Sequence, residues 1–303
     1  MRLAPDHYQK RFRKEDGFGP ADLRPLLARK GLKFLYIRKE DAPALLAGED
    51  TGIDEILSNP NYSQEAVREA AEDSLELVHE VTLQLGFTPP VQELAQKSVQ
   101  LIMRAIGSSP ELSLILRKLQ KQEGKYITSH SLMLAEVACA LATQLGWKSP
   151  LTFMKLATAA LLHDLSLTDN RLARIRRLKD IDDATDFSTA DNQNLKLHPS
   201  RAAEFSREMP QLPPDIDVIL TQHHERPDGS GFPRGLYSQQ ISPLASIFIV
   251  AHDLLDFYLD KRPANPSTNF LEAFLFEKDP EYTGGVFKKI AESMRKGEPL
   301  VLG

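Results

Sequence analysis

The sequence predicts a mainly α-helical protein in which a helical bundle follows a small N-terminal α/β unit. Apolar residues recur at helical spacing through most of the chain from Gln64 onward, as in helices with one buried face. The segment before residue 63 differs, because an apolar, strand-like run at 32–37 lies between polar segments. With 303 residues, 42% of them hydrophobic, the chain is long enough to bury a large core in about two domains.

These patterns divide the chain into three parts. Residues 1–62 form the α/β unit, in which a short helix at 42–46 follows the strand. Residues 63–109 form a helical linker, which either packs on the next domain or provides a surface for a homodimer. Residues 110–303 form an all-helical domain that carries most of the histidines. We expect the N-terminal unit to be the part that could bind a signalling partner.

Composition excludes several classes of protein. No stretch approaches the roughly 18 consecutive apolar residues of a membrane-spanning helix, and the start lacks the apolar core of a secretory signal. We therefore expect a cytoplasmic protein with no membrane partner. The single cysteine, Cys139, excludes an internal disulfide framework and a thiolate metal cluster. Acidic and basic residues are interspersed at a net charge of −5, so we expect no binding to duplex nucleic acid.

Histidines occur where predicted helices face inward or end. His130 precedes Leu134 by one turn on an apolar stripe, so its ring faces the interior. His163 and Asp164 close the next apolar helix. Burying an ionised aspartate without a compensating charge is costly, and a metal ion would supply that charge.

Three further segments complete the candidate ligands. His198 begins a helix, His223 and His224 end one at a glycine-rich turn, and Asp253 lies on an apolar helix. Two consecutive histidines can converge at a helix end, where the chain turns away from the helical path. Imidazole with a bridging carboxylate suits iron, zinc or manganese, and Asp164 could hold two ions close together.

The other three histidines receive no ligand role. His7 lies in the N-terminal tail, and His79 lies on a polar helix. His252 is adjacent to Asp253, but we expect it to be rotated away from that carboxylate by the helical twist.

The order of these residues resembles the HD-GYP branch of the HD-domain metal-dependent phosphohydrolases over about residues 110–265. The matching motifs are His130, His163-Asp164, His198-Pro199, His223-His224-Glu225, Asp228-Gly229-Ser230-Gly231-Phe232-Pro233 and Asp253-Leu254-Leu255-Asp256. The resemblance implies an all-helical bundle of HD type, two divalent metal ions and hydrolysis of cyclic di-GMP. By that analogy, one ion is held by His130, His163, Asp164 and Asp253, and the other by Asp164, His198, His223 and His224. Asp164 would bridge the two ions, for which iron is the expected metal and manganese or zinc the alternatives.

The sequence departs from the family pattern at several positions. Phe232 replaces the tyrosine of Gly-Tyr-Pro, and Leu167 stands where a phosphate-binding lysine is expected. After Arg262, the second basic residue of the family's Arg-Pro-Tyr-Arg/Lys pattern is replaced by Asn265. Tyr126 occupies the place of the glutamate that holds a third metal in some relatives, so two ions are expected.

The expected function is a metal-dependent phosphodiesterase acting on cyclic di-GMP or a related cyclic or linear dinucleotide. Asp164 would have a direct catalytic role through the metals, and Arg262 would clamp the phosphate oxygens. The remaining site residues are expected to order the loop or the histidine rings: Glu225, Asp228, Gly229, Gly231, Phe232 and Pro233. One alternative is a metal-containing module that binds a cyclic dinucleotide for signalling and cleaves it weakly or not at all. Another is an HD hydrolase of a different phosphoester.

A basic cluster at 170–179 follows Asp164 closely in the sequence. It is either an ordinary solvated helix face or a replacement for the lysine absent at Leu167. In the second case, Arg171 or Arg174 would receive a phosphate, because arginine binds phosphate in a bidentate manner.

Overall fold

The computed structural model describes the backbone of residues 2–4, 7–8, 52–107, 110, 112, 126–167, 169, 171–175, 187–261 and 270–296. Side chains are described in the same ranges except at 2–8, 126–129 and 261. The chain forms two compact units, Met1–Glu49 and Asp50–Gly303. In the first unit the described part is an antiparallel pair, β1 (Arg2–Ala4) and β2 (His7–Tyr8). The strand predicted at 32–37 and the helix predicted at 42–46 lie outside the described residues.

The boundary between the units precedes the one drawn from the sequence at residue 62. Residues 52–58 are helical and belong to the second unit, whose following helices they contact. Lys97 binds Asp54 at 2.8 Å, and the Arg104 guanidinium donates to the carbonyls of Ile56 and Asn59. These contacts place residues 52–58 in the second unit.

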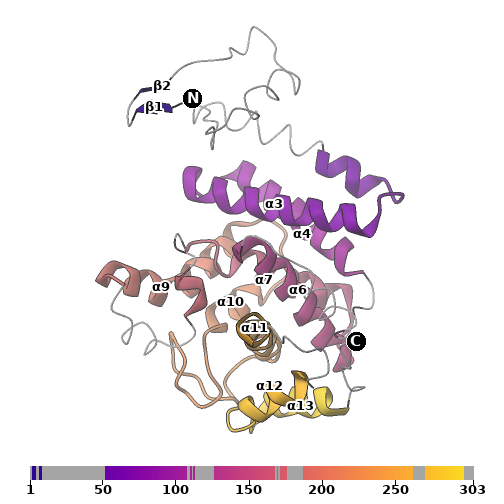
Figure 1. The fold of residues 1–303 in the computed structure, drawn as a ribbon, viewed down its shortest axis with the longest axis vertical. Helices are drawn as coiled ribbons and strands as arrows, with labels where there is room; N and C mark the ends of the chain where they lie inside the picture. The colour runs from indigo at the N-terminus through magenta and orange to yellow at the C-terminus, as the bar shows by residue number, and fades with distance from the viewer. Residues whose placement is uncertain are drawn as a thin grey trace. The chain divides into compact units, whose positions relative to one another are not determined.

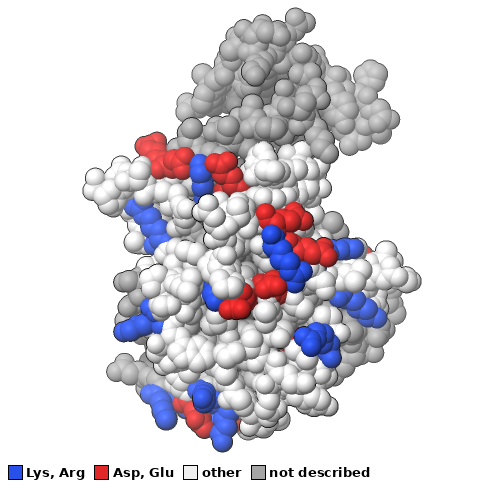
Figure 2. Space-filling view, turned by 180° about the vertical axis from the view of Figure 1, so that it is seen from behind, with Lys and Arg blue, Asp and Glu red and all other residues white. Residues whose placement is uncertain are grey.

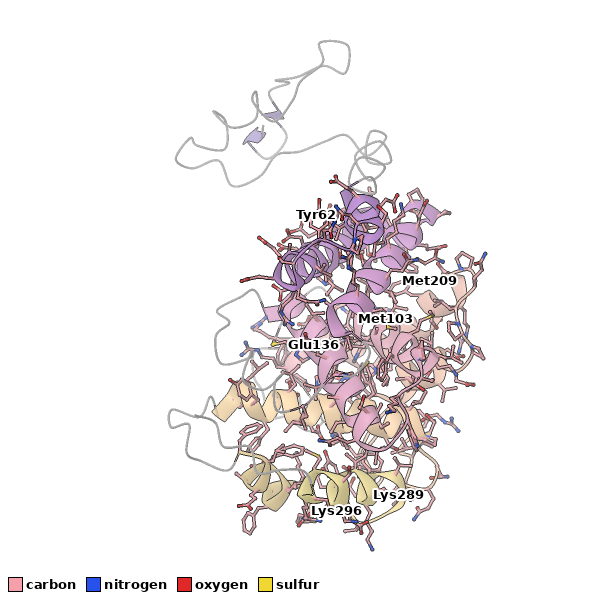
Figure 3. The ribbon with its side chains drawn as sticks, turned by 90° about the vertical axis from the view of Figure 1, so that its right-hand side faces the viewer. Tyr62, Met103, Glu136, Met209, Lys289 and Lys296 are labelled. Atoms are coloured by element: carbon pink, nitrogen blue, oxygen red, sulfur yellow. The ribbon has the colours of Figure 1, made fainter. Side chains whose placement is uncertain are left out.

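Helices α3 (Gln64–Leu85) and α4 (Pro89–Ile106) lie side by side across one end of the second unit (Figure 1). The Ser63 hydroxyl caps α3 by accepting from the amide of Ala66 at 3.1 Å. The apolar side of α3 packs on the bundle, and Arg68 binds the buried carboxylate of Glu136, which is labelled in Figure 3. The segment expected to be a linker therefore packs on the domain that follows it.

Within the described residues, five helices form the bundle: α6 (Tyr126–Gln144), α7 (Pro150–Leu162), α9 (Thr189–Glu208), α10 (Ile216–Gln222) and α11 (Pro243–Lys261). Helix α11 is seen end-on in the middle of Figure 1 and packs against α6 and α10. Its residues from Ile247 to Ala251 are all buried, which agrees with its nearly continuous apolar sequence. The mainly helical fold predicted from the sequence is confirmed.

The structure corrects the start of the helix that carries His198. This helix, α9, begins at Thr189, and Ser188 and Asp191 form a capping box at its N-terminus. Pro199 therefore lies inside the helix, where it removes one backbone donor. The basic stretch expected to be helical over 170–179 contains the single 3₁₀ turn η3 (Leu172–Arg174) within its described part.

Two C-terminal helices, α12 (Phe270–Lys278) and α13 (Gly285–Lys296), cover the end of the unit opposite α3 and α4 (Figure 1). Figure 3 shows Lys289 and Lys296 of α13 at this end and Tyr62 at the other. Phe274 and Phe287 are fully buried against the bundle. Figure 2 shows acidic and basic side chains close together on the face that it draws. None of the helices in the described part of the chain combines the length and apolar character needed to cross a membrane.

Candidate metal centre

Asp164, His198, His223 and His224 converge in the interior of the bundle. Their potential ligand atoms all lie within 4.8 Å of one another, and all four side chains are buried. The end of α7 supplies the carboxylate, the middle of α9 supplies His198, and the end of α10 supplies the histidine pair. The Nε2 atoms of His198 and His223 are 3.0 Å apart, and Oδ1 of Asp164 is 3.6 Å from His198 Nε2.

A second group lies beside the first and shares Asp164 with it. Its other members are His130 of α6, His163 at the end of α7 and His252 of α11. Their side chains are again buried, and the potential ligand atoms lie within 4.8 Å of one another. The Nε2 atoms of His130 and His252 are 3.2 Å apart, and Oδ2 of Asp164 is 3.2 Å from His163 Nε2. The two oxygens of one carboxylate thus face different groups.

Three of the histidine rings are held by backbone carbonyls that the helices leave available. A carbonyl can only accept a hydrogen bond, so each ring carries its proton on Nδ1 and leaves Nε2 as the electron-pair donor. The three contacts are His163 Nδ1 to Ala160 O at 2.9 Å, His198 Nδ1 to Leu195 O at 2.6 Å and His223 Nδ1 to Leu220 O at 2.6 Å. Ala160 and Leu220 lie in the last turns of α7 and α10, where carbonyls lack helical partners. The Leu195 carbonyl is available because Pro199 has no amide hydrogen.

This arrangement fits a metal ion better than it fits a set of hydrogen bonds. With both rings neutral, the Nε2 atoms of His198 and His223 bring two lone pairs together at 3.0 Å with no proton between them. Ligands at about 2.1 Å from one ion and at right angles to each other lie about 3 Å apart. Asp164 Oδ1 is buried and has no hydrogen-bond partner among the described residues. Imidazole nitrogens with a carboxylate are a donor set for a transition metal.

The protonation states also suit metal binding. Burial would raise the pKa of Asp164, but the neighbouring His163 and then His198 hold that pKa well below its ordinary value. Burial, followed by the electrostatic effects of the neighbouring His198 and His163, holds the pKa of His223 well below its ordinary value. The carboxylate is therefore ionised and the His223 ring neutral at neutral pH, as metal ligands must be.

The structure differs from the sequence expectation at Asp253 and His252. The Asp253 carboxylate accepts from Arg226 Nη1 at 2.7 and 2.6 Å, and its Oδ2 accepts from the Tyr282 hydroxyl at 2.7 Å. Neighbouring residues on a helix point about 100° apart, so only one of this pair can face the histidines. In the structure His252 faces them, and Asp253 belongs to neither ligand group of the described residues.

Asp253 and Arg226 form a buried ion pair. Burial would raise the pKa of Asp253, but the charge of Arg226 lowers it below its ordinary value. Burial would likewise lower the pKa of Arg226, and Asp253 instead raises it. The signal that sequence reasoning missed is a pattern of His252 with Asp256 one helical turn later, a spacing at which a carboxylate can orient an imidazole.

The loop after the histidine pair is fixed by Glu225. Its fully buried carboxylate accepts from the amides of Arg234 and Leu236, each at 2.8 Å. At Gly231 an added Cβ would lie 2.5 Å from the Glu225 Cα, so the chain can pass here only as glycine. Glu225 therefore joins the two ends of this loop through its carboxylate.

Phe232 and the turn before it complete the wall of the site. The buried Phe232 ring stacks on His224 with centroids 4.5 Å apart and planes at 16°, and the Pro233 that follows it is exposed. In the turn before it, Oδ1 of Asp228 accepts from the amide and hydroxyl of Ser230 at 3.0 and 2.6 Å. Gly229 has a φ of 80°, which a glycine adopts without strain.

The positions at which the sequence suggested a phosphate contact differ in their burial and in their contacts. Leu167 is buried among apolar side chains that include Phe232, and its carbonyl accepts from His79 Nε2 at 3.2 Å. Arg171 lies at the surface, where its guanidinium binds Asp169 and sits 5.1 Å from the Phe187 ring centroid. Arg174 ends the turn η3, and Arg262 lies outside the described residues.

Comparison with known proteins gives a consistent picture. The HD domain family matches residues 108–275. The chain is 30% identical over 182 residues to a cyclic di-GMP phosphodiesterase of Pseudomonas aeruginosa, which covers 59% of this chain and 41% of that protein. It is 38% identical over 65 residues to a cyclic di-GMP phosphodiesterase of Thermotoga maritima, covering 22% of this chain and 17% of that protein. An HDG"Y"P protein from Bdellovibrio bacteriovorus has a similar fold, with a TM-score of 0.57 at 18% identity over 88% of this chain and 84% of that chain. The chain thus spans about two fifths of the Pseudomonas relative and a smaller share of the Thermotoga one.

Proposed function

Because this chain belongs to the HD domain family, we propose that its two buried ligand groups form a metal centre that hydrolyses a phosphodiester. The observation that carries the proposal is the shared carboxylate of Asp164, which turns one oxygen to His163 and the other to His198. We propose two divalent ions, with iron as the metal and manganese or zinc as the alternatives. The substrate class is cyclic di-GMP or a related cyclic or linear dinucleotide, by analogy with the relatives.

The residues of the chain prepare the site for this chemistry. Bound metal ions would supply Lewis acidity toward a water molecule and toward the phosphoryl oxygens. Asp164 is ionised, and His223 is neutral, so both offer electron pairs without first losing a proton. Phe232 stacks on His224 and presents an apolar wall, which keeps bulk water from that side and strengthens electrostatic interactions in the site.

A specific observation favours a second candidate function, a metal-containing module that binds a dinucleotide but cleaves it weakly or not at all. Leu167 stands in place of the expected lysine, and it is packed in the core with its carbonyl bound to His79. This position therefore offers no charge to a phosphate. We expect slow cleavage of cyclic di-GMP, with more of the binding energy coming from the metals than from side chains.

The test uses the purified, metal-loaded full chain with cyclic di-GMP and with a small chromogenic phosphodiester. We expect metal-dependent cleavage of both, with weak saturation by the small substrate, and loss of both activities in Asp164→Asn. Asp217→Asn is the matched control, because it makes the same chemical change in a carboxylate that binds Arg207 at the surface. Tight binding of cyclic di-GMP without cleavage of either substrate would favour the binding module. Binding of a signalling partner by the N-terminal unit and formation of a homodimer stay predictions.

A further inference from the structure

We propose that His252 is the fourth ligand of the metal position formed with His130, His163 and Asp164, and that Asp253 is a positioning residue that does not bind the metal. The inference rests on the proposed metal centre and specifies its donors. It reverses the assignment suggested by the order of motifs in the sequence, which gives Asp253 the ligand role.

The His252 ring has the geometry of a ligand. Its Nδ1 is 3.1 Å from Oδ2 of Asp256, and a carboxylate oxygen there orients the ring with the proton on Nδ1. This leaves Nε2 as an electron-pair donor, 3.2 Å from His130 Nε2. Ligating histidines commonly give their other ring proton to a carboxylate or a backbone carbonyl. His163 uses a carbonyl in this way, and His252 uses a carboxylate.

The His252 ring also packs against the other donors of its group. Its centroid lies 4.7 Å from that of His130 and 5.4 Å from that of His163. The side chain is buried, so its nitrogen faces the interior of the group and not solvent. These three rings come from α6, the end of α7 and α11, and they meet at Asp164.

The Asp253 carboxylate is paired with the Arg226 guanidinium and not with the ligand groups. Both of its oxygens lie within 2.7 Å of Arg226 Nη1, and Tyr282 occupies a further position on Oδ2. Moving this carboxylate to a metal would leave the buried Arg226 guanidinium without its counter-charge. It would also require a rotation of about 100° around α11, which would remove His252 from the site.

The contacts of Asp253 explain how it still serves the site. Arg226 directly follows Glu225, and the Arg226 carbonyl accepts from the amide of Gly229 at 2.9 Å. By holding Arg226, Asp253 fixes the segment that presents the histidine pair, and Tyr282 ties the region between α12 and α13 to the same point. Activity alone would therefore fall on replacing either His252 or Asp253, so metal binding has to distinguish them.

If His252 is a ligand, the two metal positions are rich in nitrogen donors, which affects the metal they prefer. Within the described residues, the two groups together contain six imidazoles and the single carboxylate of Asp164. Nitrogen-rich sites favour iron, cobalt or zinc, whereas additional carboxylates favour harder ions such as manganese and magnesium. His252→Asp should therefore move the preference of this position from zinc or cobalt toward manganese.

The experiment measures metal content by elemental analysis and the absorption spectrum of Co²⁺ added to the chelator-treated full chain. We expect His252→Ala to lose about half of the metal that wild type holds, because one of two positions is affected. Asp256→Asn should weaken Co²⁺ binding at this position by about 10- to 100-fold, and Asp256→Glu should restore part of it. Asp253→Asn should keep both the metal content and the Co²⁺ spectrum of wild type. The proposal is overturned if Asp253→Asn loses metal while His252→Ala retains it.

Folding defects are separated from ligand loss by a second variant. Arg226→Met combined with Asp253→Asn removes both charges of the ion pair, so it leaves no uncompensated charge in the interior. If this double variant is folded by circular dichroism and lacks one metal, Asp253 is a ligand after all. Wild-type protein that contains both metals but cleaves no phosphodiester would contradict the proposed activity and leave the ligand assignment standing. Wild type that binds no metal would overturn both.

Discussion

Arg226→Met should be among the most destabilising substitutions in the second unit, because it leaves the Asp253 carboxylate buried without its counter-charge. Removing one partner of a buried ion pair costs about 3 to 5 kcal/mol. For a unit of roughly this size, such a loss lowers the melting temperature by about 6 to 20 °C. The remaining hydrogen bond from Tyr282 satisfies one oxygen but does not neutralise the charge.

The loss of stability in Arg226→Met should depend on pH in a definite direction. In wild type the pKa of Asp253 is below its ordinary value, so its stabilising contribution is present above the unfolded-state pKa and lost only as the pH falls through the folded-state pKa. Arg226→Met removes the largest cause that lowers the pKa of Asp253, while burial still raises it against the smaller effects of Lys278 and the Tyr282 hydrogen bond. This pKa is therefore higher in the variant than in wild type, so the penalty is largest at high pH and shrinks as the carboxyl is protonated. The difference in stability between the two proteins should therefore narrow from pH 7 to pH 5. Protonation of histidines affects both proteins and cancels in this difference.

Thermal melts followed by circular dichroism at both pH values test the argument, with two controls. Arg226→Met with Asp253→Asn should recover most of the lost stability, because both charges of the buried pair are removed together. Arg207→Met breaks the exposed pair between Arg207 and Asp217 and should cost at most about 1 kcal/mol. An effect of Arg226→Met as small as that of Arg207→Met, or one that grows as the pH falls, would refute the reasoning.

Four other predictions follow from the same structure. Asp164→Ala should remove more metal, by elemental analysis, than any single histidine substitution, because this carboxylate faces both groups. Stripping the metal with a chelator should lower the melting temperature, since it leaves a buried ionised carboxylate beside converging nitrogens; an unchanged melt would count heavily against the site. Gly231→Ala should cost about 1 to 3 kcal/mol, because its Cβ would overlap the backbone of Glu225, and an unshifted melt would contradict that close contact. If Arg171 or Arg174 receives a phosphate, Arg171→Ala with Arg174→Ala should weaken dinucleotide binding and reduce its salt dependence at constant metal content; unaltered binding would make the cluster ordinary surface.

Much of the helical architecture could be predicted because local signals specify it. The apolar spacing after Gln64 and the cap at Ser63 are features of short stretches of chain, and the structure contains the helix that they predict. The start of α9 was mispredicted because Pro199 was taken as a first helical residue, where proline is common. Ser188, ten residues before His198, and Asp191 carry the capping signal that places the start correctly.

The choice between His252 and Asp253 could not be made from local signals. Both residues lie on one apolar helix, and the family order of motifs favoured the aspartate. What decides their orientation is the partner of Asp253, since Arg226 is 27 residues away and Tyr282 is 29 residues away in the sequence. Nothing in the periodicity of α11 indicates that a buried guanidinium will face one side of the helix. Tertiary pairing therefore sets which neighbour turns toward the histidines.

Interruptions of regular helix explain why the ring nitrogens converge. A carbonyl inside an uninterrupted helix already accepts a backbone amide and is poorly placed to hold a side chain. At the ends of α7 and α10, and before Pro199 in α9, one carbonyl is released, and the histidine three residues later donates its Nδ1 proton to it. Two helix ends and one proline thus produce the same ring orientation, with Nε2 directed toward Asp164. His252 lies within the continuous helix α11, where no carbonyl is released, and Asp256 one turn later supplies the acceptor instead.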